Sequence, residues 1–254
     1  MRQRTSRPEK TDARKKFQKY KKEETVVTRP MQVTEPSVIK LLEAWRDFDF
    51  HDDGGWIDAN LAAGYEKALE AVKDLRYSAE DVEIFSRMLA DIRTPNTDAG
   101  LFLTALVNSG PDSGYTVHAH GEAEMGIGHQ NTKDLTIIGE CSFVCNAMKS
   151  GRVTIRGNVP EPGIGDGMED GVICIKGDLG SGPFQMRGGT VIIEGKPIHS
   201  MIDGKPVYDI ADRMEGGEIH IEGDIEHYDI LIEYLNNVVE HGKIFHKGKL
   251  IVDK

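Results

Sequence analysis

A seven-residue pattern that ends in glycine recurs through the second half of the chain, and it restricts the fold more than any other feature. Four full copies occupy residues 151–157, 171–177, 189–195 and 217–223, and two less regular copies at 115–121 and 133–139 precede them. Their final residues are Gly121, Gly139, Gly157, Gly177, Gly195 and Gly223, which stand 18, 18, 20, 18 and 28 residues apart. A nearly fixed period of about 20 residues predicts a repeat architecture with one supersecondary unit per copy.

Apolar and polar residues alternate within each copy, and this period of two predicts a half-buried strand. Stacking the strands in register gives two internal columns of apolar side chains. The first contains Val117, Leu135, Val153, Ile173, Val191 and Ile219, and the second contains Ala119, Ile137, Ile155, Ile175, Ile193 and Ile221. The full copies open on Gly151, Gly171, Gly189 and Gly217. We expect the glycines at both ends of each copy to form tight corners with positive φ angles.

A methionine precedes the opening glycine of every full copy by three residues. These residues are Met148, Met168, Met186 and Met214. A flexible thioether fills irregular gaps in a core well, so we interpret the four methionines as structural packing and not as metal ligands.

The rest of the chain divides into segments of different character. Residues 1–36 form a basic arm and linker, and residues 37–112 show the apolar spacing of a small helical domain. The repeats occupy residues 113–224, with a hairpin insertion at 196–213 that turns at Asp203-Gly204. Residues 225–254 predict a helix and short strands that cap the end of the repeats.

Charge and cysteine content narrow the classes of protein. Residues 1–22 contain ten Lys or Arg against Glu9 and Asp12, a net charge of +8, in a chain whose net charge is −11. Such a segment lacks the apolar residues to fold, and we expect it to contact an acidic surface or a polyanion. No apolar run reaches the length of about 20 residues needed for a membrane span. Three cysteines predict a reducing, cytoplasmic location.

Several residues resemble parts of known sites but have simpler interpretations. His118, His120 and His129 could bind a metal, yet no carboxylate or cysteine stands at a spacing that completes four ligands. The glycines at 126, 128, 163, 165 and 167 are followed by strands, whereas a phosphate loop is followed by a helix, so we interpret them as turn residues. The acidic residues Asp166, Glu169 and Asp170 also lie in a predicted turn. We therefore predict no metal and no cofactor.

The outward side chains of the strands include an uncharged group. Val172, Cys174, Thr190 and Ile192 point outward when their neighbours point inward. Exposed sheet faces that carry so little charge are usually covered by another protein surface. We therefore predict that these four residues form an interface.

The repeated unit Met-x-x-Gly-x-Val/Ile-x-Ile-x-Gly resembles a known domain over about residues 114–224. It is similar to the glycine-repeat domain at the C-terminus of the glutamate synthase large subunit, which also forms a separate subunit of formylmethanofuran dehydrogenase. The resemblance implies a right-handed parallel β-helix that packs against catalytic domains or subunits and carries no catalytic residue. The expected fold is therefore mainly β: this β-helix, preceded by the small all-α domain and followed by the capping helix.

We expect a non-catalytic architectural or interaction subunit that docks to catalytic subunits or associates with itself. Three alternatives remain open at this point. The chain could be the glycine-repeat component of a complex of the formylmethanofuran dehydrogenase or formyltransferase type, or a carbohydrate-active β-helix enzyme that uses Asp166, Glu169 or Asp170. It could also bind nucleic acid or another polyanion through residues 1–22.

Overall fold

The computed structural model describes residues 35–48, 57–90, 99–120, 125–161 and 163–254. All of these residues belong to one compact unit, which spans residues 33–254. The basic arm of residues 1–22 and the repeat residue Gly121 lie outside the described residues.

Ten strands and five helices are present among these residues. The helices are α2 (Pro36–Asp47), α3 (Ile57–Val72), α4 (Ala79–Leu89), α5 (Ala99–Ser109) and α6 (Tyr228–Val238). The repeats contribute β1 (Gly114–His118), β2 (Asp134–Ile138), β3 (Arg152–Arg156), β4 (Val172–Ile175), β5 (Thr190–Ile193) and β8 (Glu218–Ile221). The insertion contributes β6 (Ser200–Ile202) and β7 (Lys205–Val207), and the C-terminus contributes β9 (Lys243–His246) and β10 (Lys249–Asp253).

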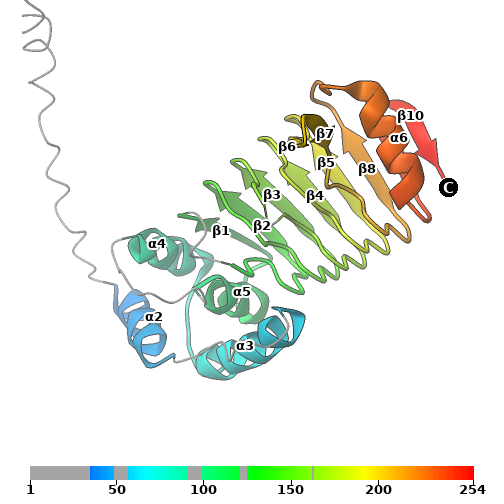
Figure 1. The fold of residues 1–254 in the computed structure, drawn as a ribbon. Coiled ribbons are helices and arrows are strands. Elements are labelled where there is room, and N and C mark those ends of the chain that lie inside the picture. Colours follow the sequence, from blue (N-terminus) through cyan, green and yellow to red (C-terminus); the bar gives the residue numbers. More distant parts are fainter. Residues whose placement is uncertain (1–34, 49–56, 91–98, 121–124, 162) are drawn as a thin grey trace, which may run out of the picture. The chain divides into compact units, whose positions relative to one another are not determined.

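Eight strands form one sheet in the order β1-β2-β3-β4-β5-β8-β9-β10 (Figure 1). Every neighbouring pair is parallel except β9 and β10, which form an antiparallel hairpin. The insertion forms the predicted hairpin, in which β6 pairs with β7 and the turn is made by Asp203 and Gly204, both with positive φ.

The predicted mainly β fold, a right-handed parallel β-helix, is wrong. The described residues form an α/β fold with one mostly parallel, eight-stranded sheet and five helices. The repeats specify one strand each, and they carry no information about how the helices pack. Here Phe102 of α5 and Val117 of β1 belong to the same continuous apolar core, so the helices and the sheet are built on one core.

Strand register agrees with the predicted columns from β2 onward. Ile137, Ile155, Ile175, Ile193 and Ile221 are aligned across five strands, and each is completely buried. The first strand differs, because Tyr115 pairs with Leu135 and Val117 pairs with Ile137. The residue opposite Gly139 is consequently Ala119, where the repeat spacing predicted Gly121.

The methionines pack as predicted and connect successive repeats. All four are completely buried. The Cε methyl group of Met168 lies so close to Gly189 of the next repeat that a Cβ atom there would be 2.5 Å from it. Met148, Met186 and Met214 approach Gly171, Gly217 and Gly242 in the same way. Gly242 therefore continues the series of opening glycines beyond the four full copies.

Helix α4 begins at a capping sequence. Ser78 caps α4 in a reciprocal capping box, in which its hydroxyl accepts from the Asp81 N–H and the Asp81 carboxylate accepts from the Ser78 N–H. Val82, Phe85 and Leu89 form the buried face of α4. This helix packs on β1, the edge strand of the sheet.

Candidate functional site: the outer face of the sheet

One row of side chains runs across the outer face of the sheet and contains Cys174 and Ile192, two of the four residues predicted to form an interface; Val172 and Thr190 lie in the adjacent row. The row with Cys174 consists of Thr116, Thr136, Thr154, Cys174, Ile192, His220 and Phe245, which the strand register aligns; we call this row the outer column. It contains no Asp, Glu, Lys or Arg. The residues on either side of each member in the strand point to the opposite face.

Charged residues flank the outer column on both sides. Arg152 and Glu218 continue the row that contains Val172 and Thr190, and Arg156, Lys176 and Glu194 belong to the row on the other side. Alternation along each strand predicted the uncharged row but not these flanks, which depend on cross-strand register. An uncharged centre with a charged margin is the usual composition of a protein–protein interface.

Cys174 is the most buried of the four residues predicted to form the interface. Its side chain is 7% exposed, whereas Val172, Thr190 and Ile192 are half-buried. Lys176 and Glu194 form a cross-strand ion pair beside it, and the thiol lies 3.7 Å from the Glu194 carboxylate. Burial raises the pKa of the Cys174 thiol, Lys176 acts against this shift, and Glu194 adds to it. Because the chain itself covers this thiol, slow modification of Cys174 would not reveal a bound partner.

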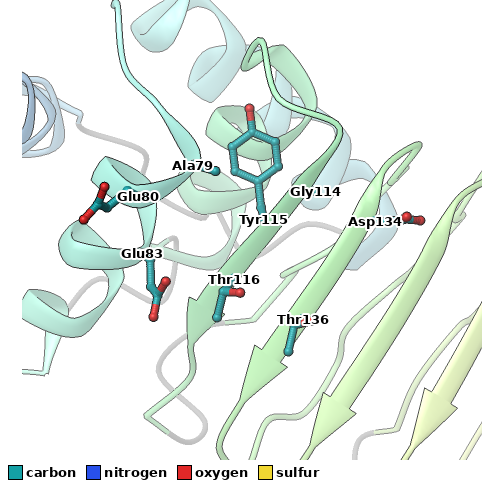
Figure 2. A pocket seen from close by; sticks show the side chains of 8 residues that line it. All are labelled: Ala79, Glu80, Glu83, Gly114, Tyr115, Thr116, Asp134 and Thr136. Carbon is teal, nitrogen blue, oxygen red and sulfur yellow. The ribbon is translucent and has the colours of Figure 1, made fainter.

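Helix α4 and strand β1 enclose a groove at one end of the outer column. The groove has a volume of about 540 Å³ and is lined by Ala79, Glu80, Glu83, Gly114, Tyr115, Thr116, Asp134 and Thr136. Figure 2 shows Thr116 and Thr136 side by side on adjacent strands, with Glu83 extending from α4 toward them. Asp134 accepts a hydrogen bond from the Arg152 N–H, which fixes its carboxylate at the sheet. The uncharged column thus begins at an acidic groove.

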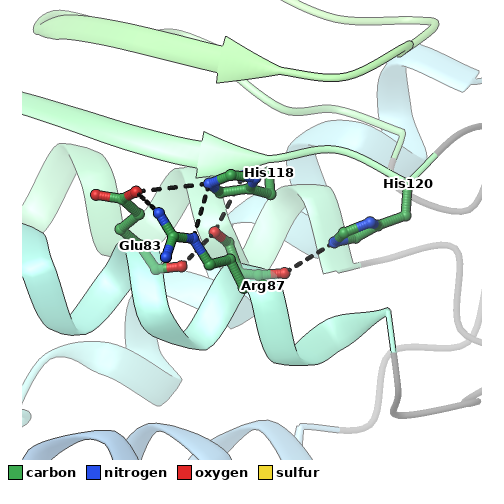
Figure 3. Close-up of polar contacts among 5 residues, drawn as sticks. Glu83, Arg87, His118 and His120 are labelled. Carbon is green, nitrogen blue, oxygen red and sulfur yellow. Dashed lines mark hydrogen bonds and ion pairs between the residues drawn. The ribbon is translucent and has the colours of Figure 1, made fainter. Parts of the chain in front are cut away.

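Polar contacts fasten α4 to the free edge of β1 (Figure 3). The His118 backbone N–H donates to the Ser86 hydroxyl at 3.0 Å, and the His120 ring contacts the Ser86 carbonyl at 3.1 Å. Arg87 donates to Nε2 of His118 at 3.0 Å and also pairs with Glu83. Edge strands must be protected from adding another strand, and α4 gives β1 this protection.

The histidines predicted as weak metal candidates do not converge. His118 and His120 contact α4, whereas His129 packs against the Tyr65 ring of α3 at a centroid distance of 5.4 Å. In the described part of the chain, no group of three or more His, Cys, Asp or Glu side chains is arranged to hold a metal.

The glycine loops and acidic turn have their hydrogen-bonding groups engaged. The N–H groups of Gly126, Gly128 and Gly165 donate to Phe143, Thr104 and Val144, so they do not point toward an anion. Asp166 accepts from the Phe184 N–H at 3.2 Å, and Asp170 accepts from the adjacent Gly171 N–H at 2.7 Å. Asp170 thus makes a local contact typical of a turn, whereas Asp166 and these glycines bond to distant segments of the chain.

Comparison with known proteins finds no match for this chain among family models, curated proteins or solved structures. In the portion that the structure describes, none of the helices combines the length and apolarity required to cross a membrane.

Proposed function

We propose that this protein is a non-catalytic interaction subunit that packs its outer column against a partner protein, either a catalytic subunit or another copy of itself. The observation that carries the proposal is the uncharged outer column itself. Parallel sheets are normally covered on both faces. The inner face of this sheet is filled by its own core, while α4 packs at β1 and α6 at β10. Over β3 to β5, Thr154 and Ile192 remain half-buried.

The resemblance of the repeats to the glutamate synthase and formylmethanofuran dehydrogenase domains supports the same proposal, because those domains pack against catalytic partners. We extend the proposal to a reducing, cytoplasmic setting, since the thiols of Cys141, Cys145 and Cys174 are all buried and none forms a disulfide. The basic segment of residues 1–22 is proposed to meet an acidic surface or a polyanion in that assembly.

Replacing Ile192 by lysine tests the proposal. A lysine at the centre of the outer column places a charge against the partner, and we expect partner binding to fall about tenfold or more. The far-ultraviolet circular dichroism should stay unchanged, because Ile192 points away from the core. The affinity-tagged protein is purified natively from its source. Size-exclusion chromatography with light scattering then measures the mass of the assembly that it forms.

Ile39→Lys is the matched control, because Ile39 lies on α2, is 41% exposed and is remote in sequence from the repeats. The control should retain the assembly of the unmodified chain. A natively purified, unmodified chain that has the mass of a lone protomer would contradict the proposal.

A further inference from the structure

The outer column changes in side-chain size at the middle of the sheet. The half on β1 to β4 has small side chains, Thr116, Thr136, Thr154 and Cys174, and the half on β5, β8 and β9 has large ones, Ile192, His220 and Phe245. Leu250 of β10 extends the large half, because it pairs with Phe245 and is 42% exposed. The rings of His220 and Phe245 stack at a centroid distance of 4.6 Å. The outer face therefore has a low half and a raised half.

The charged residues beside the outer column reverse sign at the same place. Those on the β3 and β4 side are positive and those on the β5 and β8 side are negative: Arg152, Arg156 and Lys176 against Glu194, Glu218 and Glu222. Glu222 follows β8 and joins the row of Glu194 through its N–H, which donates to the Ile193 carbonyl. The outermost charges reverse again, with Asp134 on β2 and Lys243 on β9. From β2 to β9 the signs therefore run negative, positive, negative and positive.

Both patterns are self-complementary under a two-fold rotation. The axis of this rotation runs parallel to the strands between β4 and β5, with four strands of the sheet on each side (Figure 1). Strand β4 of one copy then faces β5 of the other, and β3 faces β8. Arg152 consequently faces Glu218 of the second copy, and Asp134 faces Lys243. The small half of each outer column meets the large half of the other.

We propose that a second copy of this chain covers the outer column and forms a symmetric dimer about this axis. The proposal rests on the function proposed above and names the partner of that interface. Phe245 and Leu250 of one copy enter the groove of about 540 Å³ beside Thr116 and Thr136 of the other (Figure 2). The same surface serves on both copies, as it does in most homodimers. Sheets that pack face to face keep their strands within about 30° of each other, which this axis allows.

The dimer gives partners to charges that have none within one chain. Arg152 and Lys243 form no ion pair with any residue that the structure describes. Lys176 and Glu194 form an ion pair within each chain, and at the axis the two pairs make a ring of four alternating charges. Complementary charges of this kind fix the partner and its orientation.

Other arrangements match only part of the face. A two-fold axis along the outer column would place Arg152 against Arg156 and Glu218 against Glu222, which are like charges. Residues 1–22 contain ten Lys or Arg against two acidic residues, so they match the negative half and oppose the positive half. Eight strands about 4.8 Å apart and about 16 Å long would bury roughly 1,000 Å² in the dimer, the lower limit for a specific interface.

Analytical ultracentrifugation of the purified full chain tests the proposal. The unmodified chain should form dimers that dissociate to the isolated chain on dilution. Arg152→Glu and Glu218→Arg should each raise the dimer dissociation constant about tenfold, because the symmetry repeats each like-charge contact. Both changes in one chain should restore the constant to within about threefold of the unmodified value. Since Arg152 and Glu218 lie about 14 Å apart within one chain, too far to pair, the recovery reports contact between copies.

Glu66→Arg is the matched charge reversal, because Glu66 is exposed on α3, which packs on α5. It should leave the dissociation constant unchanged, and circular dichroism checks that every variant is folded. A double variant that dimerises no better than the single variants overturns the proposed dimer. A chain that is monomeric when purified alone, but natively joins a different protein in an assembly that Ile192→Lys disrupts, overturns the dimer and supports the interface. A lone protomer in both preparations overturns both proposals.

Discussion

Replacing Ile155 by aspartate is expected to leave the chain unable to fold. Ile155 is completely buried, and it is paired in the sheet with Ile137 on one side and Ile175 on the other. An unpaired carboxylate at this position costs several kcal/mol. Because a domain is stable by only about 5–15 kcal/mol, this single change removes most of that stability. The measurement is the soluble yield together with thermal unfolding followed by circular dichroism.

Arg156→Asp is the matched control for this change. Arg156 follows Ile155 in the same strand but points to the opposite face and is exposed. The control should express and unfold as the unmodified chain does. A soluble Ile155→Asp chain with a cooperative transition would refute the strand register.

Substitution of Gly157 by alanine should have the second largest effect. The φ angle of Gly157 is not positive, so a left-handed backbone is not the reason for glycine at this position. A Cβ atom there would overlap the carbonyl oxygen of Gly139 in the preceding repeat. Both segments adjoin paired strands, so neither backbone can move away easily. Overpacking of this kind costs about 3 kcal/mol, and the unfolding temperature should fall by about 10 °C.

Gly114→Ala is the control, because the nearest atoms to its added Cβ would lie 3.8 Å away at Asp134, an ordinary contact. Differential scanning calorimetry of the two variants should separate them clearly. Equal unfolding temperatures for Gly157→Ala and the unmodified chain would show that the repeats are not in close backbone contact.

The glycines illustrate what the repeat pattern could and could not predict. Opening glycines such as Gly189 have the expected positive φ, here +83°. The closing glycines at 157, 177, 195 and 223 do not, and each would place a Cβ against a backbone carbonyl of the preceding repeat. A positive φ together with close approach of the preceding repeat therefore explains the opening glycines, whereas close approach alone explains these four. The sequence shows the residue type, but only the packing shows the reason.

The first strand shows a limit of alternation as a predictor of register. A shift of two residues keeps every side chain on the same face, so alternation alone cannot distinguish two such registers. Spacing favoured Gly121 as the closing residue of the first copy. In the structure Tyr115 pairs with Leu135 instead, and its hydroxyl accepts from the Asp112 N–H. This contact ties the end of the sheet to the segment after α5.

The fold class and the packing of α6 against the hairpin could not be predicted, because both depend on contacts between distant parts of the sequence. Helical periodicity predicted a small helical domain over residues 37–112, where the structure has α2 to α5, but it could not show that their buried faces join the core of the sheet. The hairpin itself was predicted by the Asp203-Gly204 turn. The groove between the hairpin and α6 could not be predicted, because it depends on the orientation of α6 relative to the hairpin, which leaves Ile230 exposed.

Hydroxyl-radical footprinting of Ile192 in the outer column and of Val172 in the adjacent row tests the central claim most directly. The labelling rates of Val172 and Ile192 are compared between the isolated chain and the assembly purified natively from its source, with Ile39 as the internal control. Docking through the outer column predicts labelling of Val172 and Ile192 about fivefold slower in the assembly, because an interface core excludes water, and an unchanged rate at Ile39. Equal rates at Val172 and Ile192 in the two samples would contradict the claim.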